Sequence, residues 1–130
     1  MKQACTRAAK YLAIVFTLFF FNTANAQYVT IPDATFVSWL QSHGYAGCMN
    51  GNQLDTTCSA VVNATTMNCY AVPIRDLTGI QYFKNLTHLD CSNDSLYTIP
   101  AFPSTLTNIN CDYNKLSSLP TLPAALAVLH

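Results

Sequence analysis

Apolar residues recur along the second half of the chain with a spacing that is itself repeated. Residues 86–96 (LTHLDCSNDSL) align with residues 106–116 (LTNINCDYNKL) at an offset of 20 residues. Residues 64–74 (ATTMNCYAVPI) fit the same frame 22 residues earlier with weaker apolar positions, and Leu126 and Leu129 begin a further copy. This self-similarity indicates one structural unit used about three to four times, with the last copy truncated.

Within each copy the apolar fourth and sixth positions alternate with polar neighbours, which predicts a short strand with one buried face. One such strand cannot bury its face alone, so we expect the copies to stack into a parallel sheet with apolar rows inside. The ninth position turns the chain. Asn114 can bond to unpaired backbone there, Asp94 can only accept hydrogen bonds when ionised, and Val72 can do neither.

Proline pairs separate the predicted strands, in residues 99–103 (IPAFP) and 119–123 (LPTLP). Proline blocks a regular helix and favours extended backbone. We therefore expect the connections on the convex side to be largely non-helical, which also suits the short repeat.

A helical pattern precedes the repeats. Pro32 and Asp33 suit the start of a helix, and Gly44 suits its end. Its apolar face comprises Phe36, Val37, Trp39 and Leu40. This pattern predicts a helix that covers the exposed core of the first copy, with Trp39 in the packed face rather than in contact with a ligand.

Cys48 and Cys58 bracket a polar loop that contains the turn signal Asn50–Gly51. We expect a disulfide to close this loop after export. A calcium loop is the alternative. It is disfavoured because Asn50 and Asn52 stand where carboxylates are wanted and only Asp55 is acidic.

The pattern L-P-x-L-P-x-x-L-x-x-L-x-C-x-x-N-x-L resembles the short bacterial class of leucine-rich repeats. Residues 76–86 (DLTGIQYFKNL) resemble the linker of internalin-like repeats, and residues 31–36 (IPDATF) resemble the opening that precedes such repeats in secreted proteins of the Bacteroidetes type. The resemblance covers residues 31–130. It implies a binding module, often the front part of a longer exported protein.

The predicted fold is a leucine-rich-repeat solenoid of short parallel β-strands with largely non-helical convex turns, preceded by a helical N-terminal cap. The predicted organisation is a signal peptide at residues 1–26, a capping helix and Cys48–Cys58 loop in residues 27–60, and the repeats in residues 61–130.

The N-terminus predicts export. Lys2, Arg7 and Lys10 precede an apolar run over residues 11–21, and Ala24-Asn25-Ala26 supplies an A-x-A pattern. This order is typical of a secretory signal peptide cut after Ala26. The run is too short for a membrane anchor, which needs about 20 residues. We therefore expect a secreted or cell-surface protein with no transmembrane segment after signal removal.

Composition excludes some functions. The chain has six basic and six acidic residues, and charged residues make up 9% of it. Nucleic-acid binding normally requires a basic excess, so we expect no nucleic-acid partner.

The other mature cysteines, Cys69, Cys91 and Cys111, all occupy the sixth position of their copies. A zinc site is one interpretation, but zinc needs four converging ligands rather than a straight row. We expect three reduced, buried thiols in one interior row, with no metal and no cofactor.

Catalysis is the functional alternative to binding. His88 and Asp90 are two residues apart on one predicted strand and point to the same face, but no nucleophile motif accompanies them. We therefore expect no enzymatic activity in this chain.

The third, fifth and seventh positions of each copy face away from the core, so they predict a ligand-binding concave face with Tyr113 at its rim. The candidate residues are Thr66, Asn68, Tyr70, His88, Asp90, Ser92, Asn108, Asn110, Asp112 and Tyr113.

The predicted function is an exported binding module for a protein or glycan ligand, of the adhesion type. The alternatives are the targeting portion of a larger exported enzyme whose catalytic domain lies outside this chain, and a purely structural surface protein. His130 falls within a copy of the repeat. We therefore expect the chain to be truncated or to be the front of a longer protein.

Overall fold

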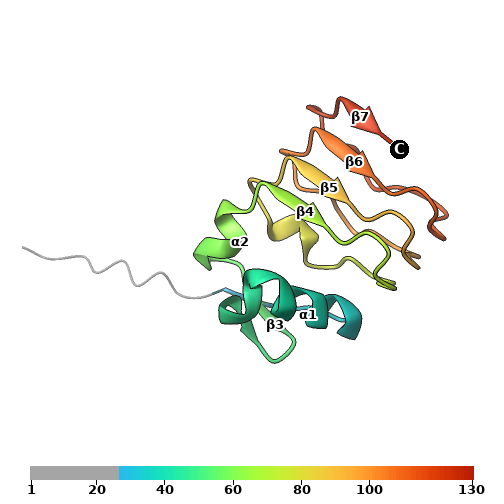
Figure 1. Ribbon diagram of the computed structural model, residues 1–130. Coiled ribbons are helices and arrows are strands. Elements are labelled where there is room, and N and C mark those ends of the chain that lie inside the picture. The colour runs from blue at the N-terminus through green and yellow to red at the C-terminus, as the bar shows by residue number, and fades with distance from the viewer. Residues whose placement is uncertain (1–26) are drawn as a thin grey trace, which may run out of the picture.

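The computed structural model describes residues 27–130, so the predicted signal peptide at residues 1–26 lies outside the described residues. These residues form two sheets, with strand orders β1-β3-β2 and β4-β5-β6-β7 (Figure 1). The first sheet is antiparallel and consists of β1 Tyr28–Thr30, β2 Met49–Asn50 and β3 Gln53–Asp55. The second is parallel and consists of β4 Thr66–Asn68, β5 His88–Asp90, β6 Asn108–Asn110 and β7 Val128–Leu129.

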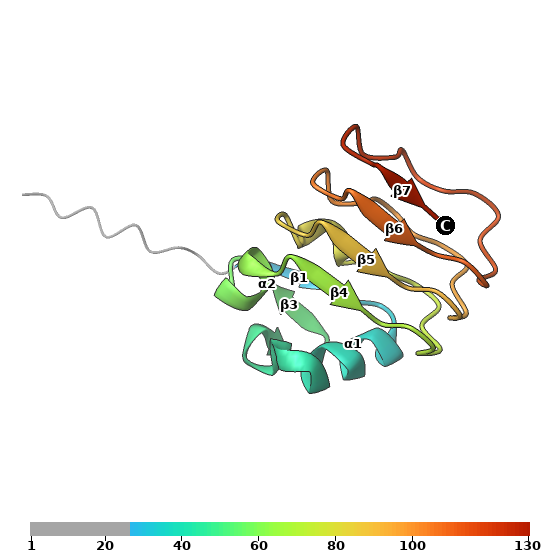
Figure 2. The same ribbon diagram turned by 45° about the horizontal axis from the view of Figure 1, so that its top comes forward.

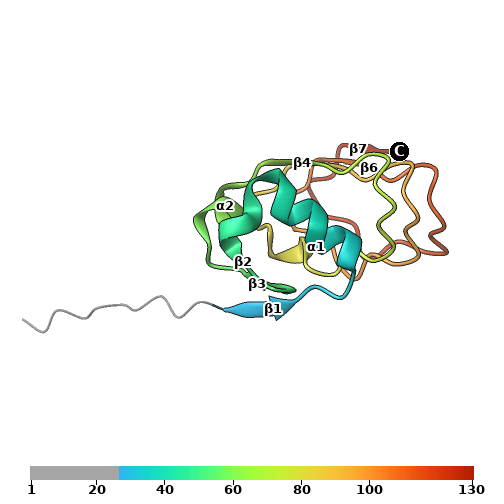
Figure 3. The same ribbon diagram turned by 60° about the horizontal axis from the view of Figure 1, so that its bottom comes forward.

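Short helical segments connect and cover the sheets. They are α1 Ala34–Leu40, the π turn η1 Gln41–Tyr45, the 3-10 turn η2 Ala46–Cys48, α2 Ser59–Asn63 and the 3-10 turn η3 Ile80–Tyr82. Figure 2 shows α1 beside β4, at the end of the parallel sheet opposite β7. In Figure 3 the two sheets lie on opposite sides of the view, with α1 between them.

The repeat spacing corresponds to the register of the parallel sheet. Met67 pairs with Leu89, Leu89 with Ile109, and Ile109 with Leu129. Successive side chains of a strand point to opposite faces, so this register aligns the apolar fourth positions in one row. Met67, Leu89 and Ile109 are buried, whereas Leu129 is 41% exposed. The apolar row therefore opens to solvent at β7.

The prediction of a leucine-rich-repeat solenoid preceded by a helical N-terminal cap is wrong. Residues 27–130 form a small mixed α/β domain in which an antiparallel three-stranded sheet accompanies the parallel one. Its buried apolar residues make one continuous core that runs from Ile31 and Phe36 to Ile109. The physical reason is that strands of two or three residues bury little apolar surface by themselves. The N-terminal elements complete the core and belong to the same domain.

The expected helix forms as α1, and Asp33 explains where it begins. Asp33 Oδ1 accepts a hydrogen bond from the Phe36 amide at 2.8 Å, which caps the first turn. Gly44 has φ 93° and sits where the helical backbone is broken. Trp39 is 7% exposed and stacks near Phe36 and Tyr45. The interpretation of Trp39 as a packing residue is therefore confirmed.

Two contacts join the N-terminal elements to the rest of the domain. Asp33 Oδ2 accepts hydrogen bonds from the amides of Arg75 at 2.9 Å and Asp76 at 3.3 Å. Gly79 has φ 115°, and a Cβ added there would collide with the side chain of Ile31. Glycine is favoured at this position because L side chains rarely adopt this backbone angle and because a Cβ would displace the end of the Ile31 side chain. The absence of a side chain at Gly79 therefore leaves room for the side chain of Ile31.

Candidate functional site

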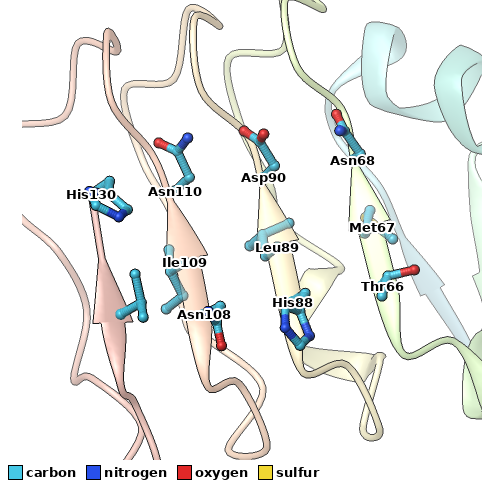
Figure 4. Close-up of a pocket in the computed structure, with 11 residues that line it drawn as sticks. Thr66, Met67, Asn68, His88, Leu89, Asp90, Asn108, Ile109, Asn110 and His130 are labelled. Carbon is cyan, nitrogen blue, oxygen red and sulfur yellow. The ribbon is translucent and has the colours of Figure 1, made fainter.

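The outward side chains of β4, β5 and β6 gather on one face of the parallel sheet. We call this surface the polar face; it comprises Thr66, Asn68, His88, Asp90, Asn108, Asn110 and His130. Together with the strands beneath, they line a hollow of about 390 Å³ (Figure 4). Alternation explains the arrangement, because the intervening Met67, Leu89 and Ile109 are buried on the other side.

Along one row of the polar face, each side chain has an oxygen that accepts a hydrogen bond from a backbone amide. Asn68 Oδ1 accepts from the Tyr70 amide at 2.9 Å, Asp90 Oδ1 from the Ser92 amide at 3.0 Å, and Asn110 Oδ1 from the Asp112 amide at 3.2 Å. Such bonds to the amide two residues on are the usual turn chemistry of Asn and Asp. Within residues 27–130 the second polar atom of each side chain has no hydrogen-bond partner. The row therefore offers amide, carboxylate and amide groups in fixed positions.

Figure 4 shows His130 continuing this row beyond Asn110. Its backbone pairs with the neighbouring strand, because the His130 amide donates to the Ile109 carbonyl at 3.0 Å. His130 occupies the fifth position of its copy, as Asn68, Asp90 and Asn110 do in theirs. The sequence prediction omitted His130, although the repeat frame itself would have identified it.

A second row lies nearer the start of the strands and contains Thr66, His88 and Asn108 (Figure 4). Neighbouring threonines orient two of these side chains. Thr87 Oγ1 lies 2.9 Å from His88 Nδ1, and Thr107 Oγ1 donates to Asn108 Oδ1 at 2.9 Å. The structure thus brings the predicted third- and fifth-position residues together on one surface.

The remaining predicted residues lie beyond the strand ends around a second hollow of about 400 Å³, which we call the tyrosine hollow. It is lined by Tyr70, Ser92, Asn93, Asn110, Asp112 and Tyr113. Ser92 is only 5% exposed, and its hydroxyl donates to Asp90 Oδ1 at 2.6 Å. Ser92 therefore positions the Asp90 carboxylate and presents little surface of its own to a ligand. The prediction omitted Asn93, which shares the eighth position with Tyr113.

The three cysteines of the repeats form a ladder of thiols. Each Sγ donates to a carbonyl of the next strand at 3.4 Å: Cys69 to Asp90, Cys91 to Asn110, and Cys111 to His130. The prediction of burial is confirmed for Cys69 and Cys91 and is wrong for Cys111, which is only partly buried. Burial raises the pKa of all three thiols. They are therefore neutral and poor nucleophiles, because the thiolate is the reactive form.

Asp94 is a buried carboxyl without hydrogen bonds. Its side chain is 9% exposed, and neither carboxylate oxygen has a hydrogen-bond partner within residues 27–130. Burial raises the pKa of Asp94 to about 7, although the nearby Val72 amide and Cys69 thiol oppose the shift. Asn114, at the equivalent position, donates from Nδ2 to the Cys91 carbonyl at 2.8 Å and accepts at Oδ1 from the Leu96 amide at 3.0 Å. The expected role of Asn114 in its turn is confirmed.

The Cys48–Cys58 disulfide is present, as the sequence predicts. Within residues 27–130, no cluster of three or more His, Cys, Asp or Glu side chains is arranged to hold a metal ion. In the same range, no helix has the length and apolar character needed to cross a membrane.

Comparisons with known protein families, with characterised proteins and with solved structures find no match to this chain. The resemblance to secreted bacterial repeat proteins therefore stays a prediction.

Proposed function

We propose that this protein is an exported recognition module that binds an extracellular protein or glycan through the polar face. The observation that carries the proposal is the row formed by Asn68, Asp90 and Asn110. Each side chain is held by a backbone amide at one oxygen and keeps a second polar atom unpartnered within the described residues. Groups fixed in this way bind a ligand at a low cost in side-chain entropy.

The hollow over the polar face is suited to binding rather than to reaction. His88, Asp90 and His130 are its titratable residues, and its lining includes no serine or cysteine. The one hydroxyl among the lining residues belongs to Thr66, whereas His88 Nδ1 lies against Thr87 Oγ1 outside the hollow. A hydrolytic site would need a nucleophile within hydrogen-bond reach of its base. The proposal therefore assigns no catalytic step to these residues.

Two observations support export to a secreted or cell-surface location. The Cys48–Cys58 disulfide is of the kind that persists in oxidising compartments. The positive start, apolar run and A-x-A pattern of residues 1–26 predict export by means of a cleaved signal peptide.

The test is a binding screen of the exported chain against extracellular proteins and glycans, repeated with Asp90→Asn. Asparagine keeps the Oδ1 acceptor that holds Ser92 and removes the charge, so the fold is retained while the ligand contact changes. We expect Kd to rise about tenfold with an unchanged Tm, as for a hot-spot residue.

Ser118→Ala is the matched control, because Ser118 is exposed and lies outside the polar face. It should leave Kd unchanged. A ligand whose Kd is the same for the wild type and for a folded Asp90→Asn, Asn110→Asp double variant does not use this surface. That outcome, or no ligand at all, would overturn the proposal.

A further inference from the structure

Two exposed tyrosines stand on either side of the tyrosine hollow. Tyr70 is 57% exposed and Tyr113 is 85% exposed. They follow β4 and β6, which are separated by one strand, so their backbones are roughly 10 Å apart. Neither side chain makes a hydrogen bond within residues 27–130. Two large aromatic faces are therefore left uncovered around one small hollow.

Tyr113 has a backbone conformation that does not suit its side chain. Its φ is 54°, in the left-handed region, and Ala71 at 58° and Asn93 at 57° hold the equivalent positions of the other copies. Glycine and asparagine are favoured in this region, whereas bulky residues are disfavoured. At 85% exposure Tyr113 gains almost no packing in return. A strained residue that contributes nothing to the core is a candidate for a role in binding.

Planar polar groups lie between the tyrosines. Asn110 Oδ1 is held by the Asp112 amide at 3.2 Å, which leaves its Nδ2 available. The side chains of Asn93 and Asp112 make no hydrogen bond within the described residues. Amides and carboxylates carry two polar atoms side by side and can therefore bind pairs of adjacent hydroxyls. Asp112 adds a negative charge, and no Lys or Arg lines the hollow.

We propose that the tyrosine hollow binds a neutral hexose unit of a glycan. The C–H groups of one sugar face pack on a tyrosine ring, and the hydroxyls bond to Asn93, Asn110 and Asp112. The volume of about 400 Å³ suits a small ligand. A protein partner would need about 800 Å² on each side and a more apolar centre. The proposal rests on the proposed function in that both assign ligand recognition to this side of the parallel sheet, where Asn110 lines both hollows.

The test uses methyl glycosides of glucose, galactose, mannose and N-acetylglucosamine, with sialic acid as an anionic probe. Saturation-transfer NMR and tyrosine fluorescence with the full exported chain measure binding. We expect at least one neutral glycoside to bind and sialic acid not to bind. Tyr113→Asn should weaken the neutral glycoside about tenfold. Its Tm should stay the same or rise by about 2–5 °C, because asparagine tolerates the left-handed backbone.

Tyr97→Ala is the control, because Tyr97 is also exposed, at 55%, but lies outside the hollow. It should leave glycoside binding unchanged. The absence of saturation transfer from every glycoside to the folded chain would overturn the proposal. So would glycoside binding that Tyr113→Asn and Tyr70→Ala both leave intact.

The two proposals fail in different ways. A macromolecular ligand that depends on Asp90, combined with no glycoside binding, would leave the proposed function standing and overturn the sugar site. Glycoside binding that depends on Tyr113, combined with no effect of Asp90→Asn on any ligand, would do the opposite.

Discussion

Asp94 and Asn114 occupy equivalent positions in neighbouring copies, yet only Asn114 has hydrogen-bond partners. The Asn114 amide can donate and accept at once, so it bonds to carbonyls and to the Leu96 amide together. An ionised carboxylate has no proton to donate to a carbonyl. Asp94 is therefore buried without partners, and its pKa rises to about 7. One atom's difference in chemistry makes this turn sensitive to pH.

The stability of the domain should therefore fall as the pH rises. Folding raises the pKa of Asp94 from 3.8 to about 7. The contribution of the neutral Asp94 carboxyl to the free energy of unfolding is thus complete below pH 4. It is lost progressively as the pH rises from 4 through 7. We expect Asp94→Asn to raise the free energy of unfolding by about 2–4 kcal/mol at pH 8 and much less at pH 4.5. Urea unfolding at both pH values measures the difference.

Asp112→Asn serves as the control for Asp94→Asn, because it removes an exposed carboxylate from the turn after the next strand of the parallel sheet. Its effect on unfolding should be small at either pH. If Asp94→Asn changed the free energy of unfolding equally at pH 4.5 and pH 8, that result would contradict the raised pKa of Asp94 in the folded protein.

At the scale of elements, the docking of α1 depends on one side chain. Asp33 caps the helix through Oδ1 and bonds to the amides of Arg75 and Asp76 through Oδ2. These amides begin the segment that leads to η3. Asp33 therefore bonds to residues that lie 42 and 43 positions further along the chain. The same carboxylate thus sets where the helix begins and where it lies against the domain.

Substitutions at Asp33 should separate these two roles. Asp33→Ala removes the cap and the link to Arg75 and Asp76, and we expect a loss of about 2–3 kcal/mol in the free energy of unfolding. Asp33→Ser retains a capping oxygen on a shorter side chain and should lose about half as much. Chemical denaturation followed by circular dichroism gives both values. Equal losses for the two variants would show that the link contributes nothing.

At the scale of the whole molecule, the cysteines report on both processing and folding. The chain has six cysteines, of which Cys48 and Cys58 form the disulfide and Cys5 lies in residues 1–26. Cleavage after Ala26 would leave three thiols: Cys69, Cys91 and Cys111. In the native protein Cys111 should react first, because it is only partly buried whereas the other two are buried.

The number of thiols counted in denaturant without reductant therefore shows whether residues 1–26 are cleaved and whether the disulfide has formed. We expect three thiols from the exported chain by mass after alkylation. Four would mean that residues 1–26 remain attached. Five or six would mean that the disulfide is absent, with or without cleavage. Native labelling of Cys69 or Cys91 as fast as Cys111 would show that the thiol ladder opens readily.

Much of the parallel sheet and of the polar face could be predicted from the sequence, for a simple physical reason. A repeat imposes the same local conformation on each copy, so Leu89 and Ile109 pair because their neighbours are alike. The helix at Asp33 and the Cys48–Cys58 disulfide also depend on local signals. The antiparallel sheet does not. Val29 pairs with Leu54, which lies 25 residues further along the chain, in strands too short to show a period.

The sequence by itself determined the alternation of inward and outward residues, the register of β4 to β7 and the polar character of the surface they share. Only the tertiary structure decided that the N-terminal strands and α1 complete one continuous core, which makes a mixed α/β domain in place of the predicted solenoid. It also decided that Asp94 is buried without a partner and that Tyr70 and Tyr113 flank one hollow. These features depend on contacts between distant segments, which local patterns do not encode.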